Sequence, residues 1–207
     1  MTSLLFYTDD QEATIATDTL IATKAEEFIG HANKAIYFER MRLIIAGTGA
    51  ADLFIRWITF VNEESRATDV DSLNDQAAER LQSIWSEMQR EIPSFEEHTA
   101  TVYLFGLSDN TGLIHSYAYR SENGFASSRL PHGFALKPAM TVEQLEGVDY
   151  SKFPQSSKDI MRRQAALEYS KPKGQRVLIG GDANVITLTK AGCQFFSLGP
   201  LDIDMPT

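Results

Sequence analysis

The order of strands and helices constrains the fold of this chain more than any other feature of its sequence. Short apolar runs predict several strands at the start, and two helical patterns then follow with no strand between them. More strands, one helix and two last strands complete the chain. The expected strands are 4–7, 13–17, 35–38, 43–46, 101–107, 113–119, 125–129, 184–189 and 194–198, and the expected helices are 50–61, 74–92 and 157–169.

Hairpins are the second organising feature. Runs 101–107 and 113–119 flank the turn residues 108–112 and form the clearest hairpin in the sequence. A doubly wound parallel sheet would alternate strand and helix throughout, which this chain does not do. We therefore expect an α+β fold, a four-layer αββα sandwich of two stacked antiparallel sheets with helices on both outer faces. A length of 207 residues suits a single domain, 1–207, with one sizeable core.

Charge and cysteine content exclude several classes of partner. A formal net charge of −9, without a basic run, argues against nucleic acid and against anionic membrane surfaces. Cys193 is the single cysteine, so an intrachain disulfide cannot form, which fits a reducing compartment. The N-terminal residues lack a signal-peptide pattern, and no run reaches the ~18 apolar residues of a membrane span. These features predict a cytoplasmic protein.

Cofactor motifs give no support for a bound group. The four histidines are scattered without metal-ligand spacing. The run Gly47-Thr48-Gly49 lacks the later glycine of a dinucleotide fingerprint, and Gly180-Gly181 has no phosphate-loop lysine. We therefore expect neither a metal nor an organic cofactor.

The N-terminal region carries the strongest chemical signal. Thr2 is a small residue that permits removal of Met1, and a terminal Thr combines a hydroxyl nucleophile with an amine that can take its proton. Such a site needs a cation near the amine, a carboxylate to hold that cation, and backbone N–H donors for the oxyanion. Asp18, Lys34 and Gly47 are the candidates for these three roles.

Each of these residues also has an ordinary interpretation. Thr2 could be a frayed terminus, and Asp18 could be a turn residue. Lys34 could be the solvated end of a strand, and Gly47 could serve only a tight turn into a helix. Taken one at a time, the four residues leave these alternatives open.

The segment 2–60 resembles the start of proteasome β-subunits and of the bacterial HslV-type protease. In that family a carboxylate follows the nucleophilic Thr by 16 residues and a catalytic Lys follows it by 32, and Thr2, Asp18 and Lys34 match both spacings. The run 44–52 resembles the family's Ala-Gly turn into its first helix. Looser likenesses cover 102–106 and 180–186.

The resemblance implies a threonine-type peptidase subunit that assembles with copies of itself into a ring and cleaves peptides or proteins inside it. It also implies an ATP-dependent unfoldase as a partner. Departures from the family pattern leave alternatives open: Leu20 stands in place of an Arg, and Arg176 and Ile179 stand in place of an Asp and a Ser that orient the amine. The alternatives are a catalytically degenerate relative with an assembly or binding role, and an amidohydrolase acting on small amides.

Overall fold

Two five-stranded antiparallel sheets form the body of the protein in the computed structural model, which describes residues 2–23, 25–93, 95 and 98–204. The first sheet has the order β10-β1-β2-β11-β12 and the second the order β5-β6-β7-β8-β9. A two-stranded sheet, β3-β4, lies beside them. The strands are β1 (Leu4–Thr8), β2 (Glu12–Asp18), β3 (Leu20–Ala22), β4 (Phe28–His31), β5 (Ala35–Phe38), β6 (Leu43–Gly49), β7 (Ala100–Leu107), β8 (Ile114–Arg120), β9 (Ser128–Arg129), β10 (Gly133–Lys137), β11 (Asp182–Thr189) and β12 (Gly192–Pro200).

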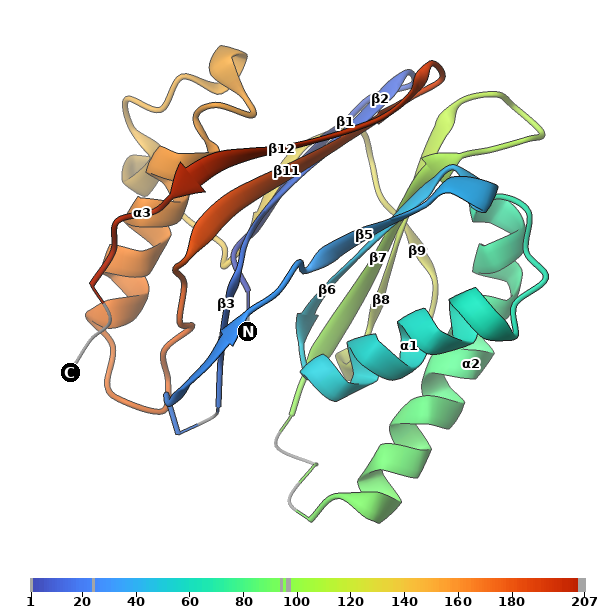
Figure 1. Cartoon of the computed structure of the whole chain (residues 1–207), viewed down its shortest axis with the longest axis horizontal. Helices are drawn as coiled ribbons and strands as arrows, with labels where there is room; N and C mark the ends of the chain where they lie inside the picture. The colour runs from blue at the N-terminus through green and yellow to red at the C-terminus, as the bar shows by residue number, and fades with distance from the viewer. Residues whose placement is uncertain (1, 24, 94, 96–97, 205–207) are drawn as a thin grey trace.

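Helices cover the outer face of each sheet (Figure 1). Helices α1 (Ala51–Glu63) and α2 (Val70–Glu91) pack on the β5–β9 sheet, and α3 (Ser157–Tyr169) packs on the sheet that contains β11 and β12. Short 3₁₀ turns lie at Glu39–Met41, Ser121–Asn123, Glu143–Leu145 and Tyr150–Lys152. The expected αββα sandwich of two antiparallel sheets is confirmed.

Three clusters of buried apolar side chains hold together the two sheets and the helix layers on their outer faces. One lies under α1 and α2 and includes Trp57 and Leu81, both fully buried. A second lies between the two sheets and includes Ile15 and Phe105. The third joins α3 to the first sheet through residues such as Ile160. Period-two burial along β1, β2 and β11 puts one set of residues toward the partner sheet and the alternate set toward α3.

Helix α2 begins four residues earlier than its apolar stripe predicts. Asp69 is its N-cap, and its carboxylate accepts from the Ser72 backbone N–H at 2.9 Å. The Ser72 hydroxyl in turn accepts from the Asp69 backbone N–H at 3.1 Å, which completes a capping box. The expected start at residue 74 was wrong because the cap, and not the first periodic apolar residue, determines where the helix begins.

Several strands differ from the sequence-based expectation. The run 125–129 is a strand only at Ser128–Arg129, because Phe125 has a φ of 58° and a buried ring. Strands β3, β4 and β10 were not expected. β10 lies between Pro131 and Pro138. Because prolines are typical of turns, the sequence between them did not indicate a strand that pairs with β1.

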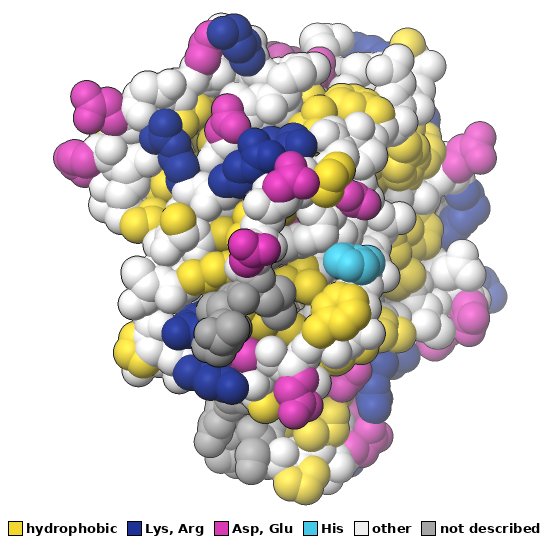
Figure 2. Space-filling view, turned by 60° about the vertical axis from the view of Figure 1, so that its left-hand side comes forward, with side chains coloured by type: hydrophobic (Ala, Val, Ile, Leu, Met, Phe, Trp, Pro, Cys, Tyr) yellow, Lys and Arg dark blue, Asp and Glu magenta, His cyan; other side chains and the backbone are white. Residues whose placement is uncertain are grey.

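The surface carries charges of both signs. Figure 2 shows Lys and Arg side chains interspersed with Asp and Glu side chains on one face, with apolar groups between them. Among the described residues, no helix is both long enough and apolar enough to span a bilayer. Cys193 is half-buried within β12, and burial raises the pKa of its thiol to about 11.

Candidate active site

Asp18 and Lys34 meet at the place where the two large sheets approach each other. Asp18 ends β2 in the first sheet, and Lys34 directly precedes β5 in the second. The Lys34 Nζ atom donates to Asp18 Oδ1 at 2.8 Å. The Asp18 side chain is fully buried, and that of Lys34 is 10% exposed. The ion pair therefore joins the two sheets in a region from which water is largely excluded.

Two backbone amides complete the surroundings of the Asp18 carboxylate. The Ser3 N–H donates to Oδ1 at 2.8 Å, and the Gly180 N–H donates to Oδ2 at 3.2 Å. The Asp18 N–H returns a hydrogen bond to the Ser3 carbonyl at 3.3 Å. These bonds fix the start of the chain, so Thr2, which is 7% exposed, lies one peptide unit from the buried ion pair.

The environment of Lys34 combines burial with a charged partner. Burial lowers the pKa of the Lys34 amine below its ordinary value, while the charge and the hydrogen bond of Asp18 oppose this shift. Paired with Asp18, the Lys34 amine is a buried cation that can stabilise negative charge developing on a nearby oxygen. Asp18 also fixes the direction in which the amine points.

Gly47 has a packing role that the structure makes explicit. A Cβ built on Gly47 would lie 2.4 Å from a ring carbon of Phe54, so only glycine permits α1 to approach β6 here. The Gly47 N–H donates to the Lys34 carbonyl at 3.2 Å. This amide is therefore engaged between β5 and β6, and it would have to give up that bond to receive an oxyanion.

Two polar groups at the site were missed by sequence reasoning. One is the Gly180 amide, although the pair Gly180-Gly181 before a strand was a visible signal. The other is Gln164 on α3, which accepts from the Ser3 hydroxyl at 2.5 Å and donates to the Pro138 carbonyl at 2.6 Å. Gln164 is 1% exposed, and a glutamine beside Ile160, Met161 and Ala165 on the buried helix face is the signal that could have indicated it.

Arg176 and Ile179, the residues aligned with amine-orienting positions, make other contacts. Arg176 pairs with Glu26 at 3.5 Å and donates from Nε to the Lys171 carbonyl at 2.7 Å. The Ile179 carbonyl accepts from the Tyr169 hydroxyl at 2.6 Å. The contacts of both residues therefore hold the segment between α3 and β11 in place.

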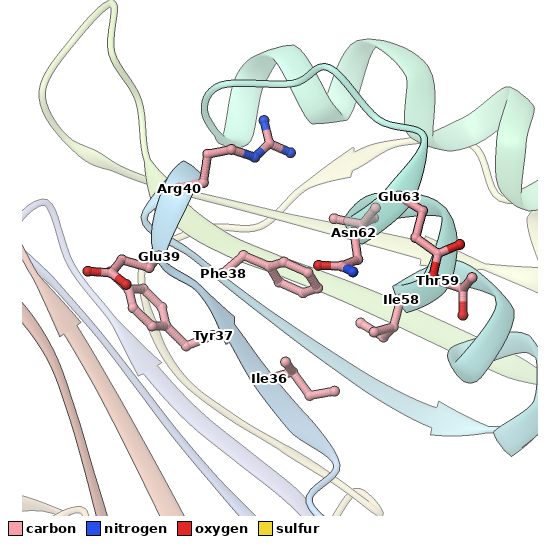
Figure 3. Close-up of a pocket in the computed structure, with 10 residues that line it drawn as sticks. Ile36, Tyr37, Phe38, Glu39, Arg40, Ile58, Thr59, Asn62 and Glu63 are labelled. Carbon is pink, nitrogen blue, oxygen red and sulfur yellow. The ribbon is translucent and has the colours of Figure 1, made fainter.

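Two cavities lie near this region. A cavity of about 470 Å³ runs between β5 and α1, where Ile36, Phe38 and Ile58 point toward one another (Figure 3). Ile36, two residues after Lys34, is among the residues that line this cavity. A second cavity, of about 240 Å³, lies between the sheets beside Asn33 and Asn184. In the described part of the chain, no group of three or more His, Cys, Asp or Glu side chains is arranged to hold a metal ion.

Solved structures of similar fold carry the name Anbu. The chain superposes on Anbu (ancestral beta-subunit) from Yersinia bercovieri with a TM-score of 0.61 and 12% identity, over 99% of this chain and 88% of that one. An Anbu (Gly-1) mutant from Hyphomicrobium sp. strain MC1 gives a TM-score of 0.63 and 11% identity, over 96% and 88% of the two chains. No protein-family model matches the sequence, and no curated protein is similar to it in sequence.

These comparisons correct the resemblance drawn from the sequence. The assignment to the proteasome β-subunit and HslV-type family is wrong, because the similar structures are Anbu proteins, a distinct proteasome-like family. The fold itself is the proteasome-like N-terminal-nucleophile sandwich.

Proposed function

We propose that this chain is a proteasome-like subunit in which Thr2, once it is the first residue, is the nucleophile of a threonine-type peptidase. The observation that carries the proposal is the buried Lys34–Asp18 pair, 2.8 Å apart, which is hydrogen-bonded to the peptide that follows Thr2. A buried lysine that a carboxylate holds close to the start of the chain is the arrangement that this chemistry needs.

The proposed reaction has two steps. The Thr2 Oγ1 atom attacks the carbonyl carbon of a peptide while its proton passes to the free α-amine, with Lys34 stabilising the charge that develops on the hydroxyl oxygen. The C–N bond then breaks, and the leaving amine takes the proton. Water next hydrolyses the Thr2 ester. Asp18 is a positioning residue that holds Lys34, and the Gly47 N–H is the proposed oxyanion donor.

Removal of Met1 is a condition of this mechanism, and Met1 lies outside the described residues. Intact mass of the purified protein measures whether the chain begins at Thr2. Thr2→Ala should abolish both peptide hydrolysis and the covalent adduct of an electrophilic inhibitor. Thr141→Ala, at an exposed threonine far along the chain, should leave both unchanged. Retention of Met1 on a protein that still hydrolyses peptides would overturn the proposal.

A second candidate function is a catalytically degenerate subunit with an assembly role. The observation that favours it is the hydrogen bond from the Gly47 N–H to the Lys34 carbonyl, which occupies the proposed oxyanion donor. The two candidates differ in one measurement. A chain that begins at Thr2, associates with other copies and yet forms no adduct with an electrophile is the degenerate form.

Self-association belongs to the proposal in either form. It is supported by the similarity to Anbu, which is described as an ancestral beta-subunit. A closed ring with its sites facing inward would confine hydrolysis to unfolded peptides, and an ATP-driven unfoldase would then be needed for folded protein substrates. We extend the proposal to a ring of identical chains in the cytoplasm.

A further inference from the structure

Thr111, His115 and Asp71 form a hydroxyl–imidazole–carboxylate chain away from Thr2. The Thr111 Oγ1 atom lies 3.2 Å from His115 Nε2, and His115 Nδ1 lies 2.8 Å from Asp71 Oδ1. Thr111 is in the turn between β7 and β8, His115 is on β8, and Asp71 is in the first turn of α2. The three groups therefore come from separate elements that pack together.

Further hydrogen bonds surround these three side chains. The Leu113 N–H donates to Thr111 Oγ1 at 3.3 Å, which leaves the hydroxyl proton free to point at His115 Nε2. Asp71 accepts from the Tyr117 hydroxyl at 2.7 Å as well as from His115 Nδ1. Burial alone would raise the pKa of Asp71, but hydrogen bonds from Ser108, His115 and Tyr117 outweigh it and lower that pKa. Asp71 thus accepts from the His115 Nδ1–H, which leaves Nε2 facing the Thr111 hydroxyl.

Burial and exposure are distributed as a nucleophilic site requires. The His115 side chain is 7% exposed and that of Asp71 22% exposed, while Thr111 is exposed. The base is therefore shielded, and the hydroxyl is open to a reagent from solvent. The β11–β12 turn also lies close to this turn, because a Cβ built on Gly112 would lie 3.8 Å from Lys190 Nζ.

The site is separate from the Lys34–Asp18 pair. Gly47 pairs with Val102 near one end of β7, whereas the turn that contains Thr111 follows Leu107 at the other end. Near Thr111 the β1–β2 turn is also present, because the Ile114 N–H donates to the Asp10 carbonyl at 3.1 Å. Three hairpin turns gather there, at the end of the molecule where the β11–β12 tip is drawn in Figure 1.

We propose that Thr111, His115 and Asp71 form a second nucleophilic site, which takes the acyl group of small activated esters or thioesters. The Thr111 Oγ1–acyl bond forms as its proton moves to His115 Nε2. The bond to the leaving alkoxide or thiolate breaks, and that group takes the proton from His115. Water, deprotonated by His115, then attacks the acyl-threonine, and the departing Thr111 Oγ1 atom takes that proton as the carboxylic acid is released. Asp71 positions the imidazole.

A phosphonylating reagent tests this site in the Thr2→Ala background, which removes the terminal nucleophile. An alkyl fluorophosphonate forms a stable Oγ1–P bond with loss of fluoride, and intact mass followed by peptide mapping locates the adduct. We expect one adduct per chain on the peptide that contains Thr111. The added change Thr111→Val should abolish it, and His115→Gln should slow labelling by about 100-fold, the usual contribution of a general base.

The matched control is Thr141→Val in the same background, since Thr141 is an exposed threonine that hydrogen-bonds to Gln144 and not to a histidine. It should label like its parent. Thr111 is in an exposed turn, so Thr111→Val folds even if His115→Gln does not, and near-UV circular dichroism verifies each variant. A chain without an adduct, an adduct that survives Thr111→Val, or equal labelling of a folded His115→Gln variant overturns the proposal.

Discussion

Asp18 is a buried carboxylate that three donors from separate segments satisfy. Lys34, the Ser3 N–H and the Gly180 N–H all point at its two oxygens. A buried ion that loses one partner leaves the other uncompensated in a medium that solvates charge poorly. Asp18 is therefore important for stability whether or not the site is catalytic, and activity loss in its variants must be separated from unfolding.

Replacement of Asp18 by Ala should lower the free energy of unfolding by about 3–5 kcal/mol, because it leaves the Lys34 ammonium without its partner in a buried site. Urea denaturation followed by circular dichroism measures this change. The control is Asp182→Ala, at an exposed position, which should stay within about 0.5 kcal/mol of the parent. A loss below about 1 kcal/mol for Asp18→Ala would show that the ion pair contributes little.

The lowered pKa of Lys34 predicts how stability changes with pH. In the folded chain burial lowers the pKa of Lys34, whereas the unfolded chain keeps the ordinary value of 10.5. Between these two values the unfolded state binds more protons, so stability rises with pH in that window. Lys34→Met should lack this rise. The measurement is the difference in unfolding free energy between parent and variant from neutral pH to 10.5, and a constant difference would contradict the prediction.

Part of the site could be predicted at this scale, and part could not. Thr2, Asp18 and Lys34 lie close enough in sequence for their spacings to be recognised, and the structure brings Asp18 and Lys34 into contact. Gly180 and Gln164 come from segments more than 160 residues away from their partners Asp18 and Ser3. No local pattern can specify such a pairing, because it depends on how the first sheet closes over α3.

At the scale of elements, Asp69 connects α2 to the β7–β8 turn. Its Oδ1 atom caps the helix through the Ser72 N–H, and its Oδ2 atom accepts from the Asp109 N–H at 2.9 Å. The pKa of Asp69 is lowered, because these hydrogen bonds outweigh the opposing effect of burial. A single carboxylate thus caps the start of α2 and holds the β7–β8 turn, which carries Thr111.

Asp69→Ala should destabilise the chain by about 2 kcal/mol, the upper part of the range for a lost N-cap, because the bond to Asp109 is lost as well. Thermal unfolding measures the effect. The control Asp75→Ala lies on the exposed side of the same helix and should change stability by less than about 0.5 kcal/mol. Equal effects of the two substitutions would contradict the capping role.

Elements with strong periodicity were the ones that the sequence predicted well. The stripe that includes Leu53, Trp57 and Val61 predicted α1, and the structure has a helix at Ala51–Glu63. Strand β10 was missed because its five residues carry no clear alternation, and its place is set by pairing with β1. The small β3–β4 sheet was missed because its strands, only three and four residues long, are too short to show an alternating pattern.

At the scale of the whole molecule, the proposed ring predicts a particle many times heavier than one chain of 23.1 kDa. Sedimentation velocity over a range of protein concentrations should give one discrete species at a whole multiple of that mass. Thr2→Ala should assemble in the same way, because it alters the nucleophile and not the outer surface. A chain that sediments as a monomer at every concentration would contradict the ring.

The order of residues along the chain also sets when each contact of Asp18 can form during synthesis. The two residues are 16 positions apart, so their contact closes a short loop and can form early in synthesis. Gly180, the third donor to Asp18, is 162 positions further along and leaves the ribosome near the end of translation. For most of its synthesis, a growing chain therefore has the Asp18 carboxylate without the hydrogen bond from Gly180. Only a nearly finished polypeptide can enclose the carboxylate on all sides.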